Sequence, residues 1–240
     1  METATFMIVL EARALDLGSL PGVYAHLQTS RIDGKRTFAE VYARAVEFGL
    51  GAVLYSEHCL RTSTDWFPAF AAEVRVLPLE PCRAFVGTEV KVEFQNGDID
   101  TVPAKTELCD YGMASVHRFP DTNGEAIPFS AVNTAEVVDR EFALSWAALA
   151  NPQLDIPGHM FEISYLRFYV VPSDDQIQAL IERAAATSVA VEINTYYHPT
   201  PVQMIRWCQE FDALITLGPN AHELDNIGDN VRVLDGLSAS

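Results

Sequence analysis

The sequence predicts an α/β protein, folded as a distorted (β/α) barrel of seven or eight strands. Segments with strand character alternate along the chain with segments of helical character, as in β/α units around a parallel sheet. Hydrophobic residues make up 49% of the 240 residues and charged residues 20%, which is ordinary for a globular protein. No repeat, low-complexity tract or long linker divides the chain, so we expect a single domain over residues 1–240.

The N-terminal half contains the clearest strand–helix units. The apolar run over residues 1–10 lacks the Lys or Arg of a signal peptide and is expected to form a first strand. A strand over residues 23–28 is followed by a helix, with Thr37 as its N-cap. Apolar side chains recur there at helical spacing, at Phe38, Val41, Ala45 and Phe48. The next elements expected are strand 52–55, helix 66–74 and strand 84–89.

The second half begins less regularly and then returns to strand–helix units. Residues 95–104 are expected to form an edge hairpin or loop, with a tight turn at Asn96 and Gly97. The elements expected after it are strand 113–117, loop 121–129, helix 134–150, helix 176–186, strand 189–194, helix 201–210 and strand 213–217. In barrels of this kind, functional side chains lie at the carboxyl ends of the strands.

Charge and composition exclude several classes of function. The net charge of −17 repels phosphate backbones and argues against nucleic-acid binding. The sequence contains no run of 18 uncharged apolar residues, so a membrane span is not expected. Four scattered cysteines without C-x-x-C spacing predict reduced thiols in a cytoplasmic protein. A negatively charged substrate would therefore need a local cation, and a bound metal ion is the obvious candidate.

Polar residues able to bind metals recur at the predicted strand ends. These residues are His26, His58, Glu89, His117, Glu192, Asn194 and His222. A single histidine at a strand end is more often a hydrogen-bonded surface residue than a ligand. Several of them at successive strand ends, with a glutamate among them, indicate a hydrolytic site for Zn²⁺, Mn²⁺ or Fe.

Seven short segments add a family resemblance. In the first half they are residues 26–30 with Asp33 and Gly34, residues 55–58 and residues 87–90. In the second half they are residues 115–117, 157–159, 191–194 and 216–222, with Gly228 downstream. In order and spacing six of these segments resemble the H-x-H-[ST], T-D-H, G-x-E, S-x-H, E-x-N and G-S-D-A-H motifs of the PHP (polymerase and histidinol phosphatase) domain. Residues 157–159 resemble the segment that carries the family's next histidine after S-x-H. The resemblance covers residues 23–228 and is closest to histidinol-phosphatase-like members.

Two positions depart from the family pattern. Gln28 replaces the second histidine of the opening motif, and Asn220 replaces the closing aspartate. In the family, both positions help to build one of up to three metal sites, and neutral amides should weaken that site. The resemblance assigns Glu89, His117 and His159 to a second site, and His58 and His222, with Asp33 as a helper, to a third. We therefore expect one or two divalent ions (Zn, Mn or Fe).

The resemblance also implies roles in catalysis. Glu89 is expected to bridge the metals, with His117 completing the site that activates water, while His26 donates a hydrogen bond or acts as a general acid. Substrate contacts are assigned to Gln28, Arg118, Arg167, Asn194 and Asn220. Lys91 lies on the same strand face as Glu89. His198 matches no ligand position and is expected to be structural or to line the substrate pocket.

These assignments predict a phosphoesterase that acts on a small phosphorylated metabolite by metal-activated water. One alternative is a metal-dependent hydrolase or lyase on the same scaffold that acts on a non-phosphorylated metabolite. Another is a catalytically impaired protein that binds a ligand or partner, since two family ligands are replaced. The substrate, the metal and the oligomeric state are not determined by the sequence.

Overall fold

Parallel strands in two curved sheets form the centre of the molecule. A computed structural model describes residues 7–228 and 234. One sheet contains, in spatial order, β2 (Val23–Leu27), β3 (Ala52–His58), β4 (Arg83–Lys91), β5 (Tyr111–Ser115) and β8 (Ile156–Pro157), all parallel. In the second sheet β9 (Val191–Ile193) pairs in parallel with β10 (Leu214–Leu217), and β1 (Leu10–Glu11) runs antiparallel along the outer edge of β10.

The two sheets meet at two seams. At one seam the backbone N–H of Gln28 donates to Ala221 at 3.0 Å, and that of Ala221 donates to His26 at 2.9 Å. At the other, the N–H of Ala190 donates to Asp155 at 2.8 Å. The curled parallel sheets thus form the predicted distorted α/β barrel, with seven parallel strands in the part of the chain that the structure describes.

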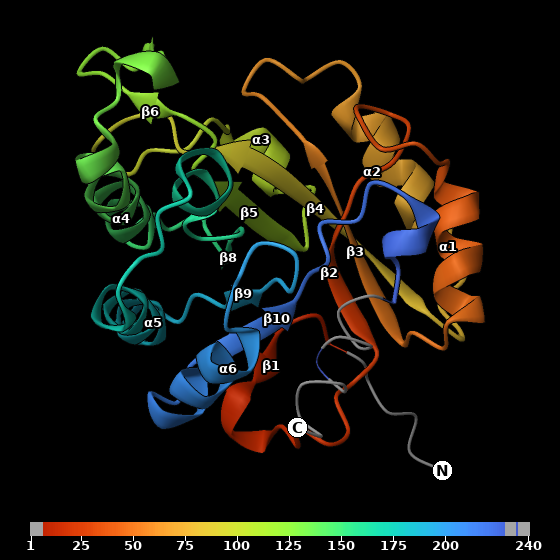
Figure 1. Cartoon of the computed structure of the whole chain (residues 1–240). Coiled ribbons are helices and arrows are strands. Elements are labelled where there is room, and N and C mark those ends of the chain that lie inside the picture. Colours follow the sequence, from red (N-terminus) through yellow and green to blue (C-terminus); the bar gives the residue numbers. More distant parts are fainter. Residues whose placement is uncertain (1–6, 229–233, 235–240) are drawn as a thin grey trace.

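Helices cover the outside of the barrel (Figure 1). The α-helices are α1 (Phe38–Glu47), α2 (Phe67–Arg75), α3 (Pro103–Thr106), α4 (Val137–Ala148), α5 (Asp174–Thr187) and α6 (Pro201–Glu210). The short helices are η1 (Ala12–Ala14), η2 (Phe129–Ala131), η3 (Thr134–Glu136), η4 (Ile163–Arg167), which is a π-helix, and η5 (Leu224–Asn226). Thr37 caps α1 as predicted, in a capping box with Glu40. No helix among the described residues is long and apolar enough to cross a membrane.

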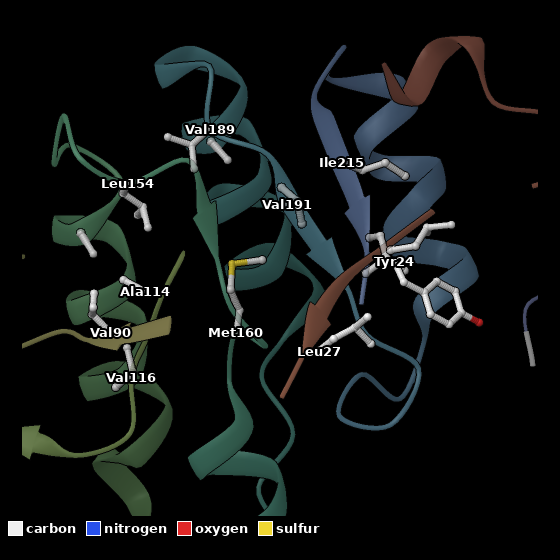
Figure 2. Packing of buried hydrophobic residues seen from close by; sticks show 14 of the residues in the cluster. Tyr24, Leu27, Val90, Ala114, Val116, Leu154, Met160, Val189, Val191 and Ile215 are labelled. Atoms are coloured by element: carbon white, nitrogen blue, oxygen red, sulfur yellow. The ribbon is translucent and has the colours of Figure 1, made fainter. Parts of the chain in front are cut away.

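Strand alternation separates two apolar cores. The larger lies between the strands and the helices, where Leu27, Val90, Val116, Val191 and Ile215 are buried (Figure 2). The smaller fills the barrel interior and includes Ala25, Leu54, Phe85, Met113 and Ile156. Because apolar side chains fill the barrel interior, the polar side chains lie at the carboxyl ends of the strands.

Several sequence expectations need correction. Residues 1–6 of the expected first strand lie outside the described residues, and only Leu10–Glu11 pair as a strand. The expected strand 113–117 is observed as Tyr111–Ser115, so His117 lies beyond its end. The loop over residues 121–129 contains β7 (Ala126–Ile127), paired antiparallel with β6 (Phe119–Pro120). Helix 134–150 begins with a 3₁₀ turn, and the two-residue β8 carried no strand signal because it is so short.

Glu141 of α4 fixes the segment that follows β8. Its buried carboxylate accepts hydrogen bonds from the backbone N–H groups of Ile163 (3.1 Å) and Ser164 (2.8 Å), and from the Ser164 hydroxyl (2.6 Å). Burial raises the pKa of Glu141 to about 7, although these donors act to lower it. The same segment places His159, whose φ of 22° is unusual for a residue other than glycine.

We predict that Glu141→Gln becomes more stable relative to the natural protein as the pH rises. In the folded protein Glu141 titrates with a pKa of about 7, against 4.5 for an ordinary glutamate. Its contribution to the free energy of unfolding therefore decreases as the pH rises from 4.5 to about 7. Between pH 5 and pH 8 the difference should shift by roughly 2 kcal/mol in favour of the variant. Denaturant unfolding at both pH values measures it. Exposed Glu136→Gln is the control, and an equal gap at both pH values would contradict the prediction.

Candidate metal centre

The Glu89 carboxylate is the centre of the polar cluster at the barrel top. It is 1% exposed. Six side chains from or just after β2, β3, β5 and β8 contact its two oxygens. Oε1 contacts Ser115 Oγ (2.6 Å), His159 Nε2 (2.9 Å) and His117 Nε2 (3.1 Å). Oε2 contacts His26 Nε2 (2.9 Å), Gln28 Nε2 (3.0 Å) and His58 Nδ1 (3.2 Å).

The chemistry of this cluster suits a metal ion. A carboxylate offers about four lone-pair sites, so six donors exceed what one glutamate accepts. Four of the six are imidazole nitrogens, which can instead present a lone pair to a cation. Ligand atoms lie within 4.8 Å of one another in three groups: His26, Glu89 and His159; His58, Glu89 and His117; and His117, His159 and Glu162. The residues present therefore fit one or more divalent ions.

The strand register explains why these side chains converge. His58 on β3 and Glu89 on β4 are direct partners in the parallel pair, so both side chains point to the same face. On β2, the register with β3 shifts between Tyr24 and Leu27, and His26 lies within the shifted stretch. Irregularities of this kind re-aim a side chain, which brings His26 to the cluster.

Two glycines make room for the polar side chains. A Cβ on Gly158 would lie 2.1 Å from the Ser115 hydroxyl, and one on Gly218 would lie 2.1 Å from a carboxylate oxygen of Glu192. Any larger residue at these positions would displace Ser115 or Glu192. The close approaches, rather than backbone freedom, therefore require glycine here.

His26 is fully buried between two carboxylates. Its Nδ1 lies 2.8 Å from Glu192 and its Nε2 lies 2.9 Å from Glu89. Burial lowers the pKa of His26, but Glu89 and Glu192 outweigh it and raise that pKa to about 9. Burial raises the pKa of Glu89 and of Glu192. The neighbouring imidazoles outweigh burial, so the pKa of each carboxyl group lies below its usual value. The imidazoles and carboxylates of the cluster thus favour each other's charged forms.

His159 joins the cluster to Glu162, a residue that the sequence analysis missed. His159 Nε2 lies 2.9 Å from Glu89, and its Nδ1 lies 2.9 Å from Glu162. Burial lowers the pKa of His159, but both carboxylates raise it well above the ordinary value. The H-x-x-E spacing was the available signal, although residues 159–161 form a turn with positive φ at His159 and Phe161 rather than a helix.

His58 and His222, which the sequence assigned with Asp33 to a third group, both lie near Asp33. His58 Nε2 lies 3.4 Å from one Asp33 oxygen, and His222 Nδ1 lies 3.7 Å from the other. Burial and the neighbouring His117 lower the pKa of His58, despite the opposing effect of Glu89. The structure links this group to the centre through the direct His58–Glu89 contact.

The two departures from the family pattern take different positions. Gln28 is buried and donates to Glu89, while its amide oxygen has no hydrogen-bond partner among the described residues. That oxygen is a further potential ligand. Asn220 lies farther out and connects Tyr197 to His222, with its amide nitrogen 2.8 Å from the Tyr197 hydroxyl and its amide oxygen 3.2 Å from His222 Nε2.

Glu57 and Glu192 are further buried acids, of which Glu192 was predicted at a strand end and Glu57 was not assigned a role. Glu57 accepts a hydrogen bond from the backbone N–H of Thr29 at 2.7 Å, which fixes the chain beside Gln28. Burial raises the pKa of Glu57 to about 7. Glu192 also accepts from the backbone N–H of His159. Each lies on a strand that the sequence identified, but only side-chain direction shows that it supports the cluster.

The remaining predicted residues are placed as follows. Arg118 donates to the Gly124 carbonyl at 2.9 Å, and the Arg167 guanidinium lies 4.6 Å from the centre of the Phe129 ring. Asn194 is buried and accepts from the N–H groups of the turn that follows it. His198 is buried, and burial lowers its pKa to about 4. Substrate contact by Arg118, Arg167 and Asn194 stays a prediction.

Comparison with known proteins identifies the fold. No family model and no curated protein matches the chain by sequence. The putative histidinol phosphatase of Listeria monocytogenes matches in structure with a TM-score of 0.70 and 14% identity, over 88% of this chain and 99% of that one. Histidinol phosphate phosphatase from Lactococcus lactis, solved with zinc, L-histidinol and phosphate, matches with a TM-score of 0.61 and 15% identity, over 92% and 94%. The chain thus has the fold of PHP-type histidinol phosphatases, as the motif resemblance predicted.

We predict that protein purified without chelator carries one or two tightly held divalent ions. Glu89→Ala should lose most of the bound metal because it removes the residue shared by two of the three ligand groups, and His117→Ala should lower occupancy. Elemental analysis measures both. Glu47→Ala, at an exposed position on α1, is the matched control and should keep the full content. Three tightly held ions, or none in any preparation, would count against this account.

Proposed function

We propose that this protein is a metal-dependent phosphoesterase that hydrolyses a small phosphorylated metabolite. The observation that carries the proposal is the convergence of four imidazoles on the buried Glu89 carboxylate. The fold supports it, because a protein of the same fold was solved with zinc and phosphate. The four cysteines are free, which fits a reducing, cytoplasmic setting.

The residues that would hold the metal are Glu89, His117 and His159, with Glu162 at the side and His58, Asp33 and His222 as a second group. Nitrogen and carboxylate donors in this mixture suit Zn²⁺, Mn²⁺ or Fe²⁺. An ion bound there supplies a strong nucleophile from water at neutral pH, together with positive charge for a phosphoryl group. Because His26 is enclosed by Glu89 and Glu192, we assign it to holding Glu89 in place.

A cavity beside the cluster would receive the substrate. It has a volume of about 350 Å³, and Glu89, His58 and His117 line its wall together with Lys91, Ile32 and Leu60. The Lys91 side chain is one-quarter exposed, and its ammonium lies 2.8 Å from Asp100, which holds this cation at the cavity wall. Such a cation favours an anionic substrate. The cavity is sized for a small metabolite rather than a polymer.

We predict that the metal-loaded protein hydrolyses phosphomonoesters. A chromogenic aryl phosphate and histidinol phosphate, each assayed with Mn²⁺, Zn²⁺ and Fe²⁺, form the test panel. Activity should fall about a thousandfold in Glu89→Ala, because a catalytic metal contributes several kcal/mol to the rate.

If the folded, metal-loaded protein hydrolysed none of these substrates with any of the metals, the phosphatase assignment would be rejected. Hydrolysis of carboxylic esters or amides alone would instead favour a different reaction on the same scaffold. Phosphate binding without turnover would favour a catalytically impaired binding protein.

A further inference from the structure

Tyr197 lies at the edge of the metal centre, although no motif assigned it a role there. Its ring packs against the His159 ring, with centroids 4.8 Å apart. Its hydroxyl lies 2.8 Å from the amide nitrogen of Asn220, on the side of the cluster where His222 also lies. The residue is only partly buried, and its contacts with His159 and Asn220 place it next to the candidate ligands.

The bonds of Asn220 set the direction of the Tyr197 hydroxyl. The Asn220 amide oxygen accepts from His222 Nε2 at 3.2 Å, so its amide nitrogen is the group that faces Tyr197. An amide nitrogen only donates, and the tyrosine oxygen must therefore accept this hydrogen bond. The hydroxyl's own proton is left to point elsewhere. An aspartate at position 220 would reverse this hydrogen bond. A carboxylate only accepts, so the Tyr197 hydroxyl would donate its proton to the aspartate in a hydrogen bond.

The backbone around Tyr197 is fixed before any ligand arrives. The Asn194 side-chain oxygen accepts from the N–H groups of Tyr196 (3.0 Å) and Tyr197 (3.3 Å). His198 Nδ1 in turn accepts from the N–H of Asn194 at 3.1 Å. A donor held in this way loses little entropy when it meets an anionic oxygen, which is how preorganised sites gain strength.

We propose that Tyr197 is a substrate-binding residue whose hydroxyl donates a hydrogen bond to a phosphoryl oxygen, and that Asn220 directs its proton. The proposal rests on the proposed function, since it names the ligand chemistry of the same site. It also explains the difference from the family pattern at position 220. Where the family has an aspartate that binds a metal, this chain has the Asn220 amide, which orients the neutral Tyr197 hydroxyl.

The test is binding of inorganic phosphate to the metal-loaded full-length protein, measured by titration calorimetry. Tyr197→Phe removes only the hydroxyl and should weaken phosphate binding about tenfold, as expected for a hydrogen bond to a charged group. Metal content and thermal midpoint should not change. Tyr196→Phe is the matched control, because the neighbouring tyrosine is exposed and should bind phosphate like the natural protein.

The same change on an Asn220→Asp background tests the direction of the bond. In that background the Tyr197 hydroxyl donates its hydrogen bond to the aspartate and not to phosphate. Tyr197→Phe should therefore alter phosphate affinity by less than about twofold. Natural affinity in Tyr197→Phe, an equal loss in both backgrounds, or no phosphate binding by the natural protein would each overturn the proposal. If phosphate binds and depends on Tyr197 but no phosphoester is hydrolysed, the proposed function alone fails.

Discussion

The buried carboxylate of Glu89 is the interaction on which the rest of this structure depends. An ionised carboxylate removed from water is costly unless charged and hydrogen-bonding partners surround it. Here six side chains contact it, and four neighbouring strands or the segments after them deliver these side chains. The shifted register of β2 and the absence of side chains at Gly158 and Gly218 both serve this convergence. The barrel top is therefore built around one charge.

Charge balance connects this centre to the proposed chemistry. Glu89, Glu162 and Glu192 bring three carboxylates together in a protein whose net charge is already −17. The neighbouring carboxylates raise the pKa of His26 and of His159, so both imidazoles favour the positively charged form, which offsets that charge. A divalent ion would replace protons in this role and so compete with them. The same positive charge would attract a phosphate group, which the remaining surface repels.

The sequence predicted the barrel and most of the cluster because both follow from local patterns. Strand–helix alternation and polar residues at strand ends indicated His58, Glu89 and His117, whose side chains lie together in the structure. The sequence named Glu192 at a strand end but gave no contact for it, because its contact with His159 depends on barrel closure. It could not place Glu162 in the cluster, because the direction of that side chain depends on the segment held by Glu141. β8 is too short for a pattern, and the connection from Asn220 to Tyr197 joins residues 23 positions apart. Such contacts exist only once the chain has folded.

The most direct test of the central claim is anomalous scattering from crystals grown without chelator. We expect one or two peaks next to Glu89, with His117 and His159 among the ligands of one ion and His58 beside the other. These peaks would also identify the metal. A fully occupied set of three ions, a cluster without any ion in metal-supplemented crystals, or ions bound elsewhere with Glu89 uninvolved would contradict this expectation.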